Sequence, residues 1–221
     1  MNTIFRNRRD AGKQLADRLL RFANRPNLIV LALPRGGAPV GFEIAKRLNA
    51  PLDVFCVRKL GMPGHEEFAI GAIASGGAQV LNGETVERLG LSDLTIEKIV
   101  ARERMELGRR EHLYRGDQPL PELRNRNVIV VDDGIATGAT VRVAIAAIRQ
   151  QEPLSVIVAA PVAPVGFAES IRKEADDAVF VIAPENFASV GQWYGDFQPT
   201  SDDEVRALLA KAKAFNQMAE A

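Results

Sequence analysis

Five apolar segments of strand length constrain the fold of this chain more than any other feature of its sequence. They are rich in Val, Ile, Leu and Ala without polar alternation, which is typical of parallel strands buried on both faces. These segments are 28–33, 52–57, 128–131, 155–161 and 178–183. Amphipathic segments of helix length lie between them, at 38–48, 140–150 and 166–174. This order predicts an α/β fold with a doubly wound, mostly parallel sheet.

Three more amphipathic segments predict helices outside this strand–helix alternation. They lie at 8–24, 92–113 and 200–215. The chain has 221 residues, which fits one large domain, and it contains no internal repeat. We therefore predict a single domain over 1–221, with its core at about 28–183. A small cap, or hood, is predicted from about 82–120 and 184–221.

Composition and charge exclude several classes of protein. The 28 basic and 28 acidic residues give a formal net charge of zero, whereas proteins that bind nucleic acid through its phosphates usually carry a basic excess. Nucleic acid is thus an unexpected partner. The single Cys56 excludes an internal disulfide and a cysteine-rich zinc site. No run of 18 apolar residues and no signal-peptide pattern occurs, so we expect a soluble cytoplasmic protein that does not bind membranes.

The segment Val128–Thr140 carries the clearest chemical signal in the chain. A buried strand ends in two acids, and a short turn with two threonines leads directly into a predicted helix. The backbone N–H groups of such a turn and the positive end of the helix dipole suit a phosphate monoester. Gly138 lets the backbone approach that anion closely. The segment has the sequence VIVVDDGIATGAT.

The two acids, Asp132 and Asp133, need a partner other than a phosphate, because carboxylates repel it. Paired sugar hydroxyls are suitable hydrogen-bond donors, and a divalent cation is the second option. The segment thus suits a phosphorylated ribose. Two alternatives are the metal-site strand of a P-loop nucleoside triphosphatase and a purely structural turn. The first needs a Gly-x-x-x-x-Gly-Lys-Ser/Thr loop, which is absent, and the second does not need this many polar residues.

The same segment resembles the PRPP-binding signature of type I phosphoribosyltransferases. It shares four apolar residues, two acids, three variable positions and then Thr-Gly-x-Thr. The resemblance extends over about 28–183 in strand and motif order. It implies that Asp132 and Asp133 hold the ribose 2′- and 3′-hydroxyls and that 136–140 wraps the 5′-phosphate. The residues that it assigns to PRPP are Asp132, Asp133, Gly134, Ala136, Thr137, Gly138, Ala139, Thr140, Arg35 and Gly36.

A second motif, Leu-Pro-Arg-Gly-Gly at 33–37, follows the first predicted strand. A guanidinium and backbone N–H groups at a strand's carboxyl end can bind a diphosphate. In the family this loop binds pyrophosphate, often through a strained peptide, and Arg35 and Gly36 match that position. A Rossmann-like glycine turn or a plain strand–helix connection is the alternative. The glycines do not spell Gly-x-Gly-x-x-Gly, which weakens a dinucleotide-binding interpretation.

Adjacent cations, Arg58 and Lys59, follow the second predicted strand and precede a segment with Gly and Pro at 60–67. They resemble the basic residues and the mobile catalytic loop of the family, which closes over the diphosphate and excludes water. The alternative is two solvated surface cations before a turn.

The resemblance implies transfer of ribose 5-phosphate from PRPP to a nitrogenous base, with release of diphosphate. Mg²⁺, Arg35, Arg58 and Lys59 would stabilise the leaving group, and we assign no protein ligand to the metal. Ala136 stands where 6-oxopurine transferases commonly carry an aspartate proposed as general base. A carboxylate-assisted mechanism at that position is therefore not expected.

The predicted hood contains four aromatic residues between 187 and 197, and Trp193 and Tyr194 are the candidates to stack on a base. Packing of these rings against the core is the alternative. A non-catalytic protein of the same fold that senses PRPP or nucleotides is a second functional hypothesis, and a dinucleotide-binding domain is a third. The family also suggests a homodimer.

Overall fold

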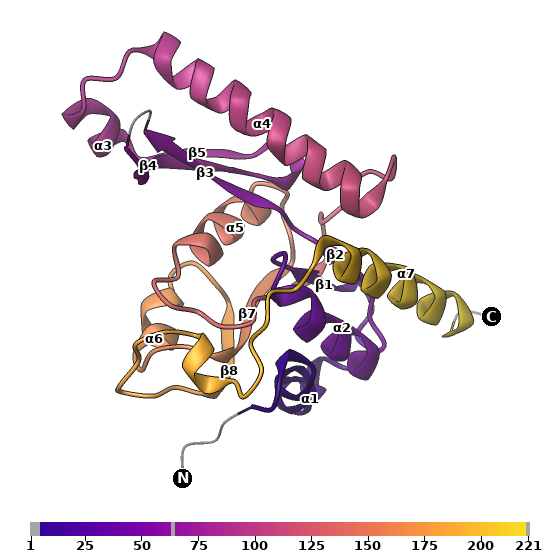
Figure 1. Ribbon diagram of the computed structural model, residues 1–221. Coiled ribbons are helices and arrows are strands. Elements are labelled where there is room, and N and C mark those ends of the chain that lie inside the picture. Colours follow the sequence, from indigo (N-terminus) through magenta and orange to yellow (C-terminus); the bar gives the residue numbers. More distant parts are fainter. Residues whose placement is uncertain (1–4, 63–64, 220–221) are drawn as a thin grey trace.

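A five-stranded parallel sheet forms the centre of the structure, a computed structural model that describes residues 5–62 and 65–219 (Figure 1). Its strand order is β2-β1-β6-β7-β8. The strands are β1 (Leu28–Ala32), β2 (Leu52–Val54), β6 (Asn127–Val131), β7 (Ser155–Val162) and β8 (Asp177–Ile182). All five predicted strands are present, and the predicted α/β fold class is confirmed.

Helices cover both faces of this sheet, which explains why its strands lack polar alternation. On one face, Ile29 and Val130 pack with apolar residues of α5 (Ala139–Arg149) and α6 (Phe167–Ile171). On the other, Val30 packs with residues of α1 (Arg8–Arg18) and α2 (Gly37–Leu48). Figure 1 shows these two helix layers on opposite sides of the sheet. Neighbouring residues along each strand therefore serve different cores.

The topology creates a crevice between β1 and β6. From β1 the chain crosses to β2 on one side, whereas β6 pairs with β1 on the other, with Ala32 opposite Val131. In open parallel sheets, ligands bind outside the carboxyl ends of the strands at such a switch point. The turns that follow β1 and β6 are the two motifs predicted to bind PRPP.

A second sheet is the main departure from the sequence-based expectation. It is antiparallel and consists of β3 (Val57–Met62), β4 (His65–Ala74) and β5 (Gln79–Leu81). The predicted strand 52–57 is thus wrong at its end, because β2 stops at Val54 and Val57 opens β3. The predicted loop at 60–67 is also wrong over its described part, which forms a hairpin. Pro63 and Gly64 lie outside the described residues.

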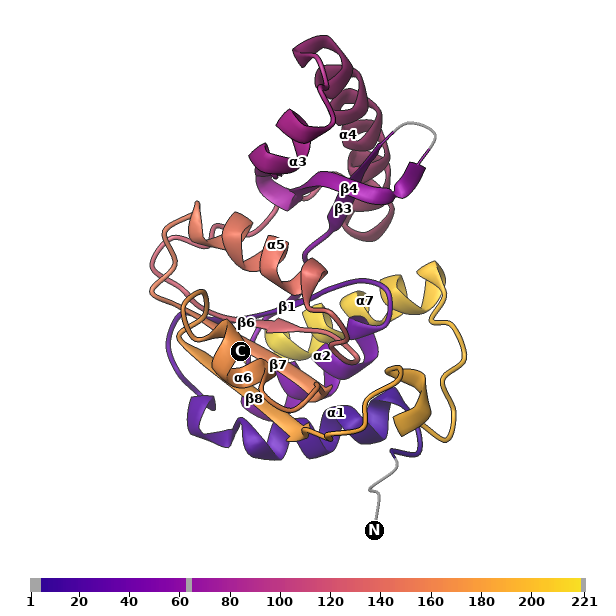
Figure 2. The same ribbon diagram turned by 90° about the vertical axis from the view of Figure 1, so that its left-hand side faces the viewer.

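Two helices follow this antiparallel sheet: α3 (Gly83–Arg88) and the long α4 (Asp93–Arg115). Figures 1 and 2 show α3, α4 and the second sheet together, above the five-stranded sheet. The predicted apolar stripe of α4, from Ile96 to Leu107, is buried against residues of this sheet. The C-terminal α7 (Asp202–Ala219) contributes to the same apolar cluster and also packs against α2.

Short 3-10 turns complete the described chain, at Leu20–Phe22 (η1), Ser75–Gly77 (η2) and Gly191–Trp193 (η3). Of the helices in the described ranges, none is both long and apolar enough to cross a membrane. The predicted division into a core and a hood stays a prediction.

Candidate functional site

The turn after β6 combines the two acids with an accessible helix N-terminus. Asp132 and Asp133 are half-buried, and the backbone N–H of Asp133 donates to Asp132 Oδ1 over 2.9 Å. Thr137 and Thr140 are exposed. Helix α5 begins at Ala139, and its N-cap residue supplies no side-chain hydrogen bond to the first turn. The N-terminal N–H groups and the two hydroxyls therefore suit an anion.

Glycines fit this turn tightly against neighbouring segments. Gly138 has a φ of +76°, and a Cβ there would lie 2.3 Å from the Phe167 ring. A Cβ on Gly134 would lie 2.3 Å from Val190. Both positions therefore exclude a side chain for steric reasons, and Gly138 also requires the conformational freedom of glycine.

The turn after β1 lies directly against the acids. Leu33 N–H donates to the Val131 carbonyl over 2.8 Å, and a Cβ on Gly36 would lie 2.0 Å from Asp133 Oδ2. The peptide bond between Pro34 and Arg35 is cis. Arg35 is exposed. The structure thus brings the two predicted motifs, about one hundred residues apart in the sequence, into contact.

A cavity of about 410 Å³ joins these turns to the antiparallel sheet. Its lining residues are Pro34, Val57, Arg58, Lys59, Gly61, Arg102, Glu103 and Thr140. The predicted cations of β3 therefore face the same space as the two turns. Lys59 is exposed, whereas Arg58 has a side chain that is 27% exposed and pairs with an acid of α4.

That acid is Glu103, which was not among the site residues predicted from the sequence. Its Oε2 accepts hydrogen bonds from Arg58 Nε at 2.9 Å and Nη2 at 2.5 Å, and its Oε1 accepts from Arg102 Nε at 3.1 Å. Glu103 is only 6% exposed. It lies among several Arg and Glu residues of a charged helix, so no local signal marks it. Only the packing of α4 on β3 brings it to the cavity.

Burial governs the ionisation of the paired acids. It raises the pKa of Asp132 well above its usual value, and the charge of Asp133 raises that pKa further. Burial also raises the pKa of Asp133, while the nearby Arg8 guanidinium lowers it. Arg8 Nε lies 2.7 Å from Asp133 Oδ2. Arg8 was not predicted as a site residue either, since it lies 125 positions from its partner.

Trp193 and Tyr194 lie in an aromatic cluster of the interior, not on an open wall. They are 8% and 7% exposed and pack with Phe5 and Phe197. The Tyr194 ring centroid lies 5.4 Å from that of Phe5 and 4.9 Å from that of Phe197. Tyr194 Oη also donates to the Asp133 carbonyl. Base stacking on these two residues therefore gains no support from the structure, and Tyr194 instead braces the turn that carries the acids.

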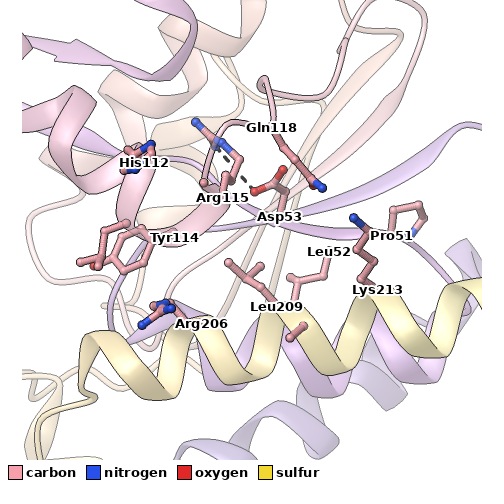
Figure 3. Close-up of a pocket in the computed structure, with 13 residues that line it drawn as sticks. Pro51, Leu52, Asp53, His112, Tyr114, Arg115, Gln118, Arg206, Leu209 and Lys213 are labelled. Carbon is pink, nitrogen blue, oxygen red and sulfur yellow. Dashed lines mark ion pairs between the residues drawn. The ribbon is translucent and has the colours of Figure 1, made fainter.

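A larger cavity, of about 860 Å³, lies away from all of these residues, between α7, the end of α4 and the start of β2 (Figure 3). Asp53 and Arg115 form an ion pair of 3.6 Å on its wall. Arg115 also pairs with Glu111 at 2.6 Å, so its charge is already compensated. Because this cavity lies at the amino end of β2, it is separate from the predicted PRPP site.

A protein cage for a metal ion does not occur in the described part of the chain, which holds no cluster of three or more His, Cys, Asp or Glu residues suited to one. Mg²⁺ typically keeps several waters and binds phosphate oxygens. We therefore assign no protein ligand to the expected Mg²⁺ ion, which stays a prediction.

The fold and this geometry define a class: an α/β protein whose candidate site, with two acids and an accessible helix N-terminus, lies at the carboxyl edge of a parallel sheet. Residues 2–198 match the family described as "Phosphoribosyl transferase domain". The chain therefore belongs to the phosphoribosyl transferase family, which confirms the resemblance that the motifs indicated.

Individual relatives of the chain support the same assignment. The chain is 42% identical over 209 residues to two proteins of Mycobacterium tuberculosis, "Putative phosphoribosyl transferase Rv0571c" and "Putative phosphoribosyl transferase MT0597". The match covers 95% of this chain but 47% of each relative, so the chain spans about half their length. The crystal structure of TT1426 from Thermus thermophilus is 39% identical, with a TM-score of 0.81, and the match covers 94% of this chain and 98% of that one.

Proposed function

We propose that the chain is a phosphoribosyltransferase that transfers ribose 5-phosphate from Mg²⁺-bound PRPP to a nitrogenous base and releases diphosphate. Its family membership supports the class of enzyme. One observation carries the finer assignment: the Asp132-Asp133 turn touches the Pro34-Arg35-Gly36 turn, and Arg58 lines the cavity beside them.

The ribose 5-phosphate end of PRPP fits the turn after β6. Its phosphate would accept from the first N–H groups of α5 and from the hydroxyls of Thr137 and Thr140, where the helix dipole favours an anion. Its ribose hydroxyls would donate to the carboxylates of Asp132 and Asp133. Those acids must then be ionised, and their burial makes this interaction dependent on pH.

The diphosphate end fits the cavity between the two sheets. Arg35, Arg58 and Lys59 would stabilise the charge that grows on the leaving oxygens as the bond to C1 breaks. A Mg²⁺ ion bound to the diphosphate supplies further charge neutralisation. Positioning of the acceptor next to C1 supplies the rest of the rate enhancement.

The nitrogenous base has no carboxylate beside it at position 136, where Ala136 follows the acids by three residues. A base that needs proton abstraction by an acid at this position is therefore a poor substrate in this proposal. A cytoplasmic location and a homodimer stay predictions.

Turnover is the direct test. The purified protein would be incubated with PRPP, Mg²⁺ and single bases from a panel of purines, pyrimidines and small amines, with diphosphate release as the readout. We expect release with at least one base and a large loss in Asp132→Asn. Absence of release and of any PRPP-dependent thermal shift would overturn the proposal.

A regulatory protein of the same fold, which binds PRPP or a nucleotide without turnover, is the second candidate. The contact between Arg58 and Glu103 favours this function, because a carboxylate already pairs with the Arg58 guanidinium in the cavity proposed for the diphosphate. Tight PRPP binding without diphosphate release, abolished in Asp132→Asn, would select this function.

A further inference from the structure

Arg8 contacts three different groups near the paired acids. It begins α1, and its side chain is 12% exposed. Its Nε donates to Asp133 Oδ2 over 2.7 Å, and its Nη1 donates to the Gln198 carbonyl over 2.7 Å. Its guanidinium carbon lies 3.9 Å from the Phe197 ring centroid. Hydrogen bonds in two directions and a stacked ring fix the plane of the guanidinium.

The acid that Arg8 contacts is held from other directions as well. Oδ2 of Asp133 lies against the backbone of Gly36, where a Cβ would approach to 2.0 Å. The Asp133 carbonyl accepts from the Tyr194 hydroxyl. Oδ2 of Asp133 is therefore held by Arg8, while the same carboxyl group also hydrogen-bonds the side chain of Asp132.

We propose that Arg8 is a positioning residue of the ribose site, which orients the Asp133 carboxylate for a ribose hydroxyl by holding Oδ2. This inference rests on the proposed function, since it assumes that PRPP binds at the acids. It also gives α1 and the segment 197–198 a role in substrate binding, because both reach the site through this one side chain.

Charge gives Arg8 a second effect on the same acid. Among the described residues, the acidic Asp132 and the cationic Arg8 act on the Asp133 carboxyl, and the Tyr194 hydroxyl lies at its backbone carbonyl. Because Arg8 lowers the pKa of Asp133 against the effect of burial, it favours the ionised form that accepts from a hydroxyl. Without Arg8, the buried pair of Asp132 and Asp133 would keep a proton up to a higher pH.

The test compares Arg8→Met and Arg8→Lys with Arg9→Met, a matched control at the next, exposed position of α1. Titration of the Asp133 carboxyl by ¹³C NMR needs no substrate. We expect Arg8→Met to raise its pKa by about one unit or more, as expected when a close opposite charge is removed. Arg9→Met should leave it unchanged. An unchanged Asp133 titration in Arg8→Met overturns the inference.

Calorimetry with PRPP and Mg²⁺ tests the positioning itself. We expect Arg8→Met to weaken binding about tenfold at pH 7.5, the usual scale for a charge-assisted hydrogen bond. Arg8→Lys should keep the Asp133 titration near the wild-type value yet still bind more weakly, because Lys lacks the planar fork. Full recovery of binding in Arg8→Lys would overturn orientation by the guanidinium. Failure of the wild type to bind PRPP would instead overturn the proposed function, while the NMR titration would still decide the contact.

Discussion

Glu103 of α4 holds Arg58 of β3 through both Nε and Nη2, at 2.9 and 2.5 Å, at the edge of the cavity proposed for the diphosphate. This contact joins the long helix to the antiparallel sheet, and it also keeps a candidate catalytic cation in a fixed orientation. A carboxylate and a diphosphate would both attract this guanidinium, so substrate binding and local stability are coupled here.

Glu103→Gln should therefore lower the stability of the protein but strengthen its binding of PRPP. Loss of the buried carboxylate leaves Arg58 with a neutral partner, and we expect a free energy of unfolding lower by about 2 kcal/mol, since part of the pair is solvated. PRPP should bind more tightly, because the cavity gains net positive charge. Urea unfolding and calorimetry measure the two effects.

The control for this prediction is Glu106→Gln on the same helix. Glu106 pairs with Arg109 and Arg110 on the surface, where ion pairs contribute at most about 1 kcal/mol. We expect little change in either quantity. Weaker PRPP binding in Glu103→Gln would show that Glu103 orients Arg58 productively and does not compete with the substrate.

Gly138→Ala should destabilise the turn after β6 for two separable reasons. Its φ of +76° disfavours any L side chain, and the new Cβ would lie 2.3 Å from Phe167. Gly166 has a similar φ of +81° but open space around a Cβ. We expect a loss of about 1 kcal/mol for Gly166→Ala and about 3 kcal/mol for Gly138→Ala. Equal losses in urea unfolding would show that Phe167 moves aside without cost.

Gly36→Ala should disturb the contact between the two motif turns. A Cβ at 2.0 Å from Asp133 Oδ2 forces the carboxylate or the turn to move, so we expect lower stability and PRPP binding weakened by about tenfold or more. Gly108→Ala is the matched control, in the middle of α4 with open space around its Cβ. It should raise stability by roughly 1 kcal/mol through helix propensity and leave binding unchanged.

The stability of the protein should depend on pH through Asp132. Burial and the charge of Asp133 raise its pKa in the folded state above the value in the unfolded chain. The folded state therefore binds the proton more tightly, and its stability falls as the pH rises through the folded-state pKa. Asp132→Asn removes the cost of ionising a buried carboxyl. The stability of this variant relative to the wild type should therefore increase with pH above about 4 and then level off.

Urea unfolding of both proteins between pH 4 and 8 measures this difference. PRPP binding should respond in the opposite sense, because ribose hydroxyls need an ionised acceptor, and should strengthen as the pH rises through the same range. A constant stability difference between Asp132→Asn and the wild type would contradict the raised pKa.

The sequence predicted most of the central sheet but not the second one. Strands such as 127–131 are apolar throughout because helices cover both faces, and this pattern is visible without coordinates. The segment 65–74 was missed although its partner strands, β3 and β5, are its neighbours in the sequence. Its apolar residues are buried by α4, which begins only at Asp93, and β-propensity depends on such tertiary packing.

The sequence by itself determined the parallel α/β architecture, the position of the acids at a strand end and the family. It did so because the apolar pattern of buried strands and the spacing of acids, threonines and glycine in the turn after β6 are local properties. Only the tertiary structure decided the partners of these residues: Arg8 for Asp133, Glu103 for Arg58, and the interior for Trp193 and Tyr194. Such pairs form between segments brought together by packing, so their chemistry follows from the fold and not from the order of residues.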